Sequence, residues 1–326
     1  MIHFNTTRRV FVVGGLSALV AAGNAQQAFP RKPIRLIVAF PPGGSTTVVA
    51  RLLGQKLTER LGQPVIVDNR PGANGVIACE ELLKSPADGH TIAMVVNTHS
   101  INPLVMGAMP YDTNRDFATV GTLYKLELVL VAHPSVAAEN LREFIALANA
   151  RPGALNFAAG DSLGLTHLAA ETFNTMAGVK IQVVPYKGTG PALVDTLGGH
   201  VQAYFSSPTA VIAHVKSGKL KAYGISGSRR SAALPEVPTF AEAGLPSYEA
   251  GTWAGILASA ATPKDVINKL SSEIAAIMNL PDIKEQLSSQ GLDPYITTPD
   301  QFSQLIRSDT ARFEKVITAA NIKIDR

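Results

Sequence analysis

The sequence of 326 residues is poor in cysteine, in charge and in long apolar runs. Cys79 is the only cysteine, so no internal disulfide can form and the core must supply the stability. It lies in an apolar helical pattern, and we interpret it as a buried filler rather than a nucleophile. No apolar stretch is long enough to span a membrane as a helix. With 46% hydrophobic and 17% charged residues, the composition is that of a globular domain protein.

Signatures of metal, nucleotide and nucleic-acid chemistry are also missing. The histidines are scattered, no cysteines are paired and no H-E-x-x-H occurs, which argues against a metal site. No G-x-G-x-x-G is present, and no lysine follows a glycine pair as in a phosphate loop. The net charge of +4 is too small and too evenly spread to indicate nucleic acid. We therefore predict no cofactor, no metal and no nucleic-acid partner.

Residues 1–25 have the pattern of an export signal. Arg8 and Arg9 form a basic start, residues 10–22 form a short apolar stretch, and Gly23-Asn24-Ala25 offers small residues for cleavage near Ala25. The segment 7–12 also resembles a twin-arginine signal. General secretion and twin-arginine export both remain open. The mature chain is predicted to be a soluble protein outside the cytoplasm, in the periplasm.

Strand-like and helix-like segments alternate along most of the chain, which predicts mostly parallel sheets covered by helices on both faces. About 300 mature residues usually form two domains. We predict a discontinuous split, with residues 26–130 plus 255–326 in lobe 1 and residues 131–254 in lobe 2. Expected strands cover 34–40, 64–67, 91–96, 127–132, 155–159, 181–185, 201–205 and 219–225, and expected helices start near 45, 76, 138, 166, 191 and 211. From Thr262 onward the pattern is helical, and Thr262-Pro263 and Thr298-Pro299 are expected helix starts, the second with a capping box to Gln301.

The most informative segment follows the first expected strand. Pro41-Pro42 ends that strand, Gly43-Gly44 allows a sharp turn, and Ser45 or Thr46 can cap the next helix. A helix start presents unpaired N–H groups and the positive end of the helix dipole, so it suits an anion. Since no phosphate-loop lysine follows, a carboxylate is a better guest than a nucleotide. The alternative is an ordinary tight turn between a strand and a helix.

One segment has the signature of an enzyme. Gly160-Asp161-Ser162-Leu163-Gly164 fits G-x-S-x-G and lies between an expected strand and an expected helix. An exported serine esterase would need a histidine and an acid to activate Ser162. The histidines after it are His167, His200 and His214, and Asp195 could join one of the last two. The other interpretation is a ligand-binding loop in which Ser162 donates a hydrogen bond. This second interpretation carries no catalytic residue.

Two further features are interpreted as structural or solvent-exposed rather than functional. Trp253 lies near the expected return crossing between the lobes, where a large aromatic residue serves more often in the core or hinge than in stacking on a guest. Arg229-Arg230 reads as an exposed basic turn.

Several ordered motifs together resemble the periplasmic solute-binding proteins of tripartite tricarboxylate transporters, the Bug family. The resemblance covers about Pro33 to Ile324 and depends on joint order rather than on any one motif. The motifs are Phe40-Pro-Pro-Gly-Gly-Ser-Thr46, Asn69-Arg-Pro-Gly-Ala73, Ala87-Asp-Gly-His-Thr91, Asn97-Thr-His99, Pro110-Tyr-Asp112, His167-Leu-Ala169, Val184-Pro-Tyr-Lys-Gly188, Leu197-Gly-Gly199, Leu234-Pro-Glu-Val-Pro238 and Glu242-Ala-Gly-Leu-Pro246.

The resemblance implies a fold of two α/β lobes that close like a flytrap on a small organic anion. It also implies delivery of that ligand to membrane permease subunits, or its report to a sensor protein. The carboxylate would be held by backbone amides, hydroxyls and bridging waters. The implied ligand residues are Gly43, Gly44, Ser45, Thr46, Thr47, Thr98 and His99 in the first lobe, and Gly160, Asp161, Ser162, Gly164, Thr166, Lys187, Gly188, Thr189 and Ser206 in the second.

The chain departs from the family pattern at positions that bear on the ligand. The family commonly has an aspartate where Thr47 stands and often an acid where Ser206 stands. Without those acids an ammonium group would lose its partners. We therefore expect a ligand with carboxylate groups and no amine, although Asp161 returns an acid in another loop.

Overall fold

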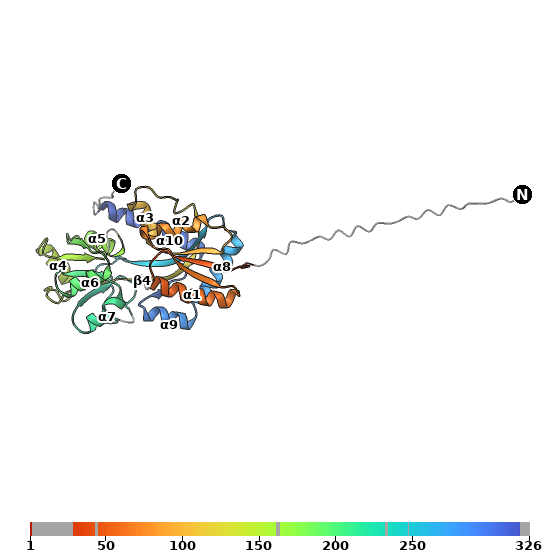
Figure 1. Cartoon of the computed structure of the whole chain (residues 1–326). Coiled ribbons are helices and arrows are strands. Elements are labelled where there is room, and N and C mark those ends of the chain that lie inside the picture. Colours follow the sequence, from red (N-terminus) through yellow and green to blue (C-terminus); the bar gives the residue numbers. More distant parts are fainter. Residues whose placement is uncertain (2–28, 43–44, 161–163, 232–233, 247, 320–326) are drawn as a thin grey trace.

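Two β-sheets, each covered by helices, make up the protein (Figure 1). The computed structural model describes residues 1, 29–42, 45–160, 164–231, 234–246 and 248–319. The export-signal prediction at residues 1–25 therefore falls almost entirely outside the described residues. No helix among the described residues combines the length and the apolar character that crossing a membrane requires.

The first sheet, sheet A, has six strands in the order β11-β4-β10-β3-β1-β2. Its strands are β1 (Ile34–Val38), β2 (Val65–Asn69), β3 (Thr91–Val96), β4 (Phe117–Glu127), β10 (Gly251–Ser259) and β11 (Asp293–Pro294). The helices that accompany it are α1 (Ser45–Leu61), α2 (Val76–Lys84), α3 (Thr98–Val105), α8 (Lys264–Met278), α9 (Pro281–Ser289) and α10 (Pro299–Ala319), with the short helix η1 (Ala73–Gly75) before α2. One apolar cluster joins α1 and α8 to one face of the sheet, and another joins α2 and α10 to the opposite face.

The second sheet, sheet B, has five strands in the order β7-β6-β8-β5-β9. Its strands are β5 (Val129–Ala132), β6 (Asn156–Ala159), β7 (Gln182–Pro185), β8 (Ala203–Ser206) and β9 (Lys221–Ile225). Its helices are α4 (Leu141–Ala150), α5 (Leu165–Ala177), α6 (Thr189–Leu197) and α7 (Pro208–Lys216). Phe173 of α5 is in ring contact with Phe144, Phe157, Phe205, Phe240 and Tyr248, so aromatic packing dominates this core.

The two-lobe α/β fold is confirmed, but the sheets are mixed rather than mostly parallel. In sheet A, β10 pairs antiparallel with both β3 and β4, and in sheet B, β5 pairs antiparallel with both β8 and β9. The reason is connectivity. A strand that enters sheet B from sheet A runs away from the junction, whereas β6 and β8 run toward it. The crossing strands must therefore oppose their neighbours.

Of the two helix caps predicted from the sequence, one is found in the structure. The capping box at the start of α10 is confirmed, because Thr298 N–H donates to Gln301 Oε1 (2.9 Å) and Gln301 N–H donates to Thr298 Oγ1 (3.2 Å). The prediction for Thr262 is wrong. Pro263 is the N-cap of α8, and the buried Thr262 hydroxyl has no hydrogen-bond partner among the described residues.

The chain crosses between the sheets twice, at Leu128 and near Ala250, and Ser226, just after β9, is hydrogen-bonded to both crossings. We call this region the hinge. Leu128 N–H donates to Ser226 Oγ (2.8 Å) and Ser226 N–H donates to Leu128 O (2.9 Å). The C-terminal helix adds a further connection. Phe313 and Ile317 of α10 pack against Leu168 of α5 and Ile101 of α3. This second connection lies beside the hinge, where α10 runs next to α3 and α5 (Figure 1).

Candidate functional site

The ends of strands from both sheets meet at the hinge. Glu127, the last residue of β4, pairs with Gly251 of β10, and Val129, two residues later, pairs with Ser206 at the end of β8. On the other side of β10, Ala254 pairs with Val96 at the end of β3. In open α/β sheets, ligands bind beyond the carboxyl ends of the strands. The loops after β1, β3, β6, β7 and β8 therefore all begin at this junction, and every predicted site residue lies in one of these loops or in the strand or helix next to it.

The turn after β1 is stabilised by Thr47. Its buried hydroxyl donates to Pro41 O (3.3 Å) and accepts a hydrogen bond from Asn69 Nδ2 (2.9 Å), which also donates to Phe40 O (2.8 Å). The Thr47 hydroxyl is thus used inside the turn. Ser45 and Thr46 of the first turn of α1 are half-buried and remain accessible, while Gly43 and Gly44 lie outside the described residues.

The start of α3 is fixed against β10. Asn97 donates through Nδ2 to Gly251 O (3.2 Å) and accepts from Thr252 Oγ1 (2.7 Å) through Oδ1, so its side chain does not cap the helix. Thr98, the first residue of α3, is half-buried at the junction. The first N–H groups of α3 therefore keep the hydrogen-bonding capacity that a side-chain cap would have used.

His99 has a packing role in the structure instead of facing the junction. Its ring is 3% exposed, stacks with Tyr111 and meets Phe117 edge-on. Cys79 Sγ lies 3.7 Å from Nδ1. Burial lowers the pKa of His99 to about 4, against a smaller opposing effect of the Thr113 backbone. The neutral imidazole belongs to the core, whereas the family resemblance implied that His99 contacts the ligand.

This buried histidine predicts a pH dependence of stability. Since the pKa of His99 is about 4 when folded and about 6.5 when unfolded, the unfolded chain binds the proton first as the pH falls. The contribution of the neutral His99 to the free energy of unfolding is complete above pH 6.5. As the pH falls toward 4, the free energy of unfolding decreases by about 3 kcal/mol. We expect His99→Gln to remove this part of the pH dependence of the unfolding free energy, measured by urea titration at pH 7.5 and 4.5.

A matched control for that experiment is His200→Gln, because the His200 side chain is 73% exposed. The control should keep the wild-type pH dependence. If both variants follow the wild type between pH 7.5 and 4.5, then His99 is not the group responsible.

The second-sheet loops are joined to one another by hydrogen bonds. Gly160 N–H donates to Thr166 Oγ1 (2.8 Å), and Gly188 N–H donates to Gly160 O (3.0 Å). A methyl group on Gly160 would lie 2.9–3.0 Å from Thr189, so the close approach of the two loops requires glycine there. The structure thus brings Gly160, Thr166, Gly188 and Thr189 together.

The remaining predicted residues differ in exposure. Gly164 is the N-cap of α5, and its carbonyl accepts the Leu168 N–H (3.0 Å). Lys187 is exposed and makes no ion pair with any described residue, whereas Ser206 is buried at the end of β8. Asp161 and Ser162 lie outside the described residues.

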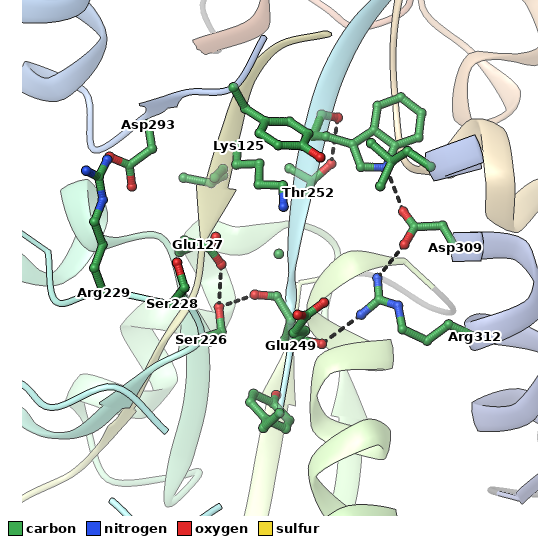
Figure 2. A pocket seen from close by; sticks show the side chains of 18 of the residues that line it. Lys125, Glu127, Ser226, Ser228, Arg229, Glu249, Thr252, Asp293, Asp309 and Arg312 are labelled. Atoms are coloured by element: carbon green, nitrogen blue, oxygen red, sulfur yellow. Dashed lines mark hydrogen bonds and ion pairs between the residues drawn. The ribbon is translucent and has the colours of Figure 1, made fainter. Parts of the chain in front are cut away.

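A cavity that the sequence did not predict lies at the hinge (Figure 2). Its volume is about 490 Å³, and it shares no residue with the predicted site. We call it the hinge cavity. Its lining comes from β4, the segment between β9 and β10, the start of β10, β11 and α10. It consists of Lys125, Leu126, Glu127, Ser226, Gly227, Ser228, Arg229, Ala241, Tyr248, Glu249, Ala250, Gly251, Thr252, Trp253, Asp293, Pro294, Tyr295, Leu305, Asp309 and Arg312.

The two mixed sheets, the hinge and the loops that face the junction define a periplasmic binding protein fold. This class is supported by solved structures that the chain matches over nine tenths of its length. R. palustris Rpa4515, solved with adipate, is 32% identical, with a TM-score of 0.77, and the match covers 90% of this chain and 99% of that one. MatC from Rhodopseudomonas palustris, solved with bound malate, is 29% identical, with a TM-score of 0.73, covering 89% and 100%.

Sequence comparison assigns the family. Residues 49–322 match the model of the tripartite tricarboxylate transporter family receptor. Protein BugT of Bordetella pertussis is 38% identical over 327 residues, which covers 98% of this chain and 99% of BugT. The chain belongs to the tripartite tricarboxylate transporter receptor family. It is a periplasmic solute-binding protein that works with the membrane subunits of a transporter.

Proposed function

We propose that the chain binds a small dicarboxylate between its two lobes and delivers it to the membrane subunits of its transporter. The observation that carries the proposal is the set of helix starts at the junction. The helices α3 of one lobe and α6 of the other begin without a side-chain capping hydrogen bond. Their first N–H groups, with the adjacent hydroxyls, are donors that a carboxylate can accept.

The lobes in this proposal are residues 26–130 plus 255–326 and residues 131–254. Thr98 and the first turn of α1 would hold one carboxylate. Thr166 and the Lys187-Gly188-Thr189 turn would hold the other, with Ser206 beside them. The adipate and malate carried by the two relatives support a ligand with two carboxylates. Since Thr47 and Ser206 carry no charge, we expect the ligand of this site to lack an amine.

The test is a titration of the purified protein with adipate, malate, succinate, benzoate and glutamate. A ligand that binds only the native state raises its stability by about 2.7 kcal/mol at a hundred times the dissociation constant. We expect a rise in melting temperature with at least one dicarboxylate, and heat of binding in calorimetry with a stoichiometry of one. Tight binding of glutamate and of no dicarboxylate would overturn the proposal.

We also infer that binding is not followed by chemistry. The histidine–aspartate pair that an esterase could use, His200 with Asp195, is on the surface with 3.9 Å between its nearest atoms. Asp195 Oδ2 accepts the hydroxyl of Tyr186 (2.9 Å) instead. Turnover of a chromogenic ester that disappears in Ser162→Ala would favour the esterase; we expect none in either protein.

Export is the remaining part of the proposal. We infer that residues 1–25 direct export and are cleaved near Ala25, so the mass of the periplasmic protein should match a chain that begins at about residue 26. Delivery to the transporter is expected to be the main role. Ligand-dependent binding to a periplasmic sensor domain, with no binding to the membrane subunits, would indicate the sensory role instead.

A further inference from the structure

The hinge cavity has the size and the lining of a binding site. Its volume of about 490 Å³ falls in the range of small-molecule pockets, about 300–1,000 Å³. Aromatic and aliphatic side chains form part of the wall, namely Tyr248, Trp253, Tyr295 and Leu305. The lining combines strands of sheet A with the segment between β9 and β10, where Tyr248 and Ala250 pack into the core of sheet B, so a guest would contact both lobes at once (Figure 2).

Four of the charged residues around the cavity already have partners. Arg229 Nη2 lies 2.6 Å from Asp293 Oδ1. Asp309 accepts hydrogen bonds from Trp253 Nε1 (2.6 Å) and Arg312 Nη2 (2.9 Å). These two ion pairs leave Lys125, Glu127 and Glu249 as the charged groups of the lining that make no ion pair with a described residue.

Lys125 supplies an unpaired cation. Its Nζ lies 4.1 Å from the centre of the Tyr295 ring, and the side chain extends from β4 into the cavity (Figure 2). An ammonium group has three hydrogen-bond donors and no acceptor. A carboxylate is its natural partner, and no carboxylate of a described residue lies within ion-pair distance of it, although Glu127 is near enough to interact electrostatically.

The Glu127 carboxylate lacks hydrogen-bond donors. Ser226 Oγ donates to Glu127 Oε2 (3.0 Å) and is also in hydrogen-bond contact with Ala250 O, while it accepts the Leu128 N–H. A hydroxyl carries a single hydrogen, so Ser226 cannot donate fully to both acceptors. Burial raises the pKa of Glu127, with Asp293 and Glu249 adding to the rise, while Ser226 and Lys125 oppose it. A further donor at this carboxylate would relieve the shortage.

We propose that the hinge cavity is a second binding site, for a small zwitterion of the amino-acid class. Its carboxylate would pair with Lys125, its ammonium with Glu127 and Glu249, and its side chain would lie against Trp253 and Tyr295. A simple carboxylate would leave Glu127 without a new donor. A bound metal is not supported, because no three acidic, histidine or cysteine residues in the described part of the chain are grouped as metal ligands.

The site differs from the dicarboxylate site in its residues and in its charge. The two share no residue, and the proposed dicarboxylate site offers no acid for an ammonium among its described residues. A zwitterion that holds Lys125 and Tyr295 of one lobe together with Ser226 and Glu249 of the other would favour one angle between the lobes. It would thereby change the affinity for the dicarboxylate, since a ligand shifts an equilibrium by its differential affinity for the two states.

The experiment uses the full mature protein and the twenty L-amino acids, screened by ligand-detected NMR and then measured by calorimetry. For the amino acid that binds best, its N-acetyl derivative lacks the ammonium and its amide lacks the carboxylate. We expect each derivative to bind at least tenfold more weakly. Lys125→Met and Glu127→Gln should each lower the affinity at least tenfold. The exposed controls Lys264→Met and Glu285→Gln should leave it unchanged.

A variant in the proposed dicarboxylate site tests where the amino acid binds. Thr98→Asp should leave amino-acid binding intact, because Thr98 is outside the hinge cavity. Circular dichroism checks that Lys125→Met and Glu127→Gln are folded. If either variant does not fold, the N-acetyl and amide derivatives still test whether binding requires both charges of the amino acid. No binding by any amino acid at 10 mM would overturn the proposal. So would equal binding of the N-acetyl derivative, or loss of binding in Thr98→Asp alone.

Discussion

Replacing Thr98 by aspartate is expected to abolish dicarboxylate binding without harm to the fold. Thr98 is the first residue of α3, and an acidic side chain there interacts favourably with the positive end of the helix dipole, by about 0.3–1 kcal/mol. The same carboxylate would lie beside the ligand and compete for the same N–H groups. Juxtaposed like charges cost several kcal/mol, so the affinity should fall at least a hundredfold, about 2.7 kcal/mol.

The measurement is calorimetric titration with the dicarboxylate that binds the wild type, beside a thermal melt of the unliganded variant. The control is Thr98→Ser, which keeps the hydroxyl and should stay within about threefold of the wild-type affinity. A folded Thr98→Asp protein with wild-type affinity would mean that the start of α3 does not contact the ligand. That result would remove the main support for the proposed site.

The largest expected loss of stability follows from Phe173→Ala. Phe173 is fully buried in α5, with ring-centre distances of 5.7–6.2 Å to five aromatic neighbours. Truncating a buried phenylalanine removes its transfer free energy and leaves a cavity, which costs about 3–5 kcal/mol. Since whole proteins are stable by only about 5–15 kcal/mol, the sheet B core should melt at a clearly lower temperature.

Urea unfolding followed by circular dichroism measures this loss. Met176→Ala on the same helix is the matched control, because Met176 is 38% exposed. Its loss should stay below about 1 kcal/mol. Equal losses in the two variants would show that the aromatic cluster around Phe173 is not a rigid core.

The fold could be predicted from the sequence where apolar periodicity was clear, and was missed where it was not. The strand β4 was not expected before Glu127, because Gly121 and polar residues interrupt its pattern and its pairing with β10 shifts register twice. The helix α3 was missed since it contains Pro103, which usually ends a helix. The return crossing was expected near Trp253, and Trp253 itself lies inside β10, where it pairs with Lys125 of β4 in sheet A.

The two candidate sites differ in how far the sequence could indicate them. The loops at the junction were named because a glycine turn and several family motifs are local in the sequence. The hinge cavity could not be named in this way, because its lining comes from segments that are far apart in the chain. Arg229 alone looks like an exposed basic residue, and only the structure places Asp293 beside it. Lys125 and Glu127 likewise look like a solvated strand end until the fold surrounds them.

The single cysteine gives a practical advantage for following lobe movement. Cys79 is buried, and burial raises the pKa of its thiol to about 12, so at neutral pH it stays a protonated and unreactive group. Two new cysteines at exposed positions, such as Ile66 (56% exposed) in β2 of sheet A and Val194 (65% exposed) in α6 beside sheet B, could therefore carry a pair of fluorophores. Energy transfer between the dyes would report opening and closing in single molecules, with the native thiol left in place.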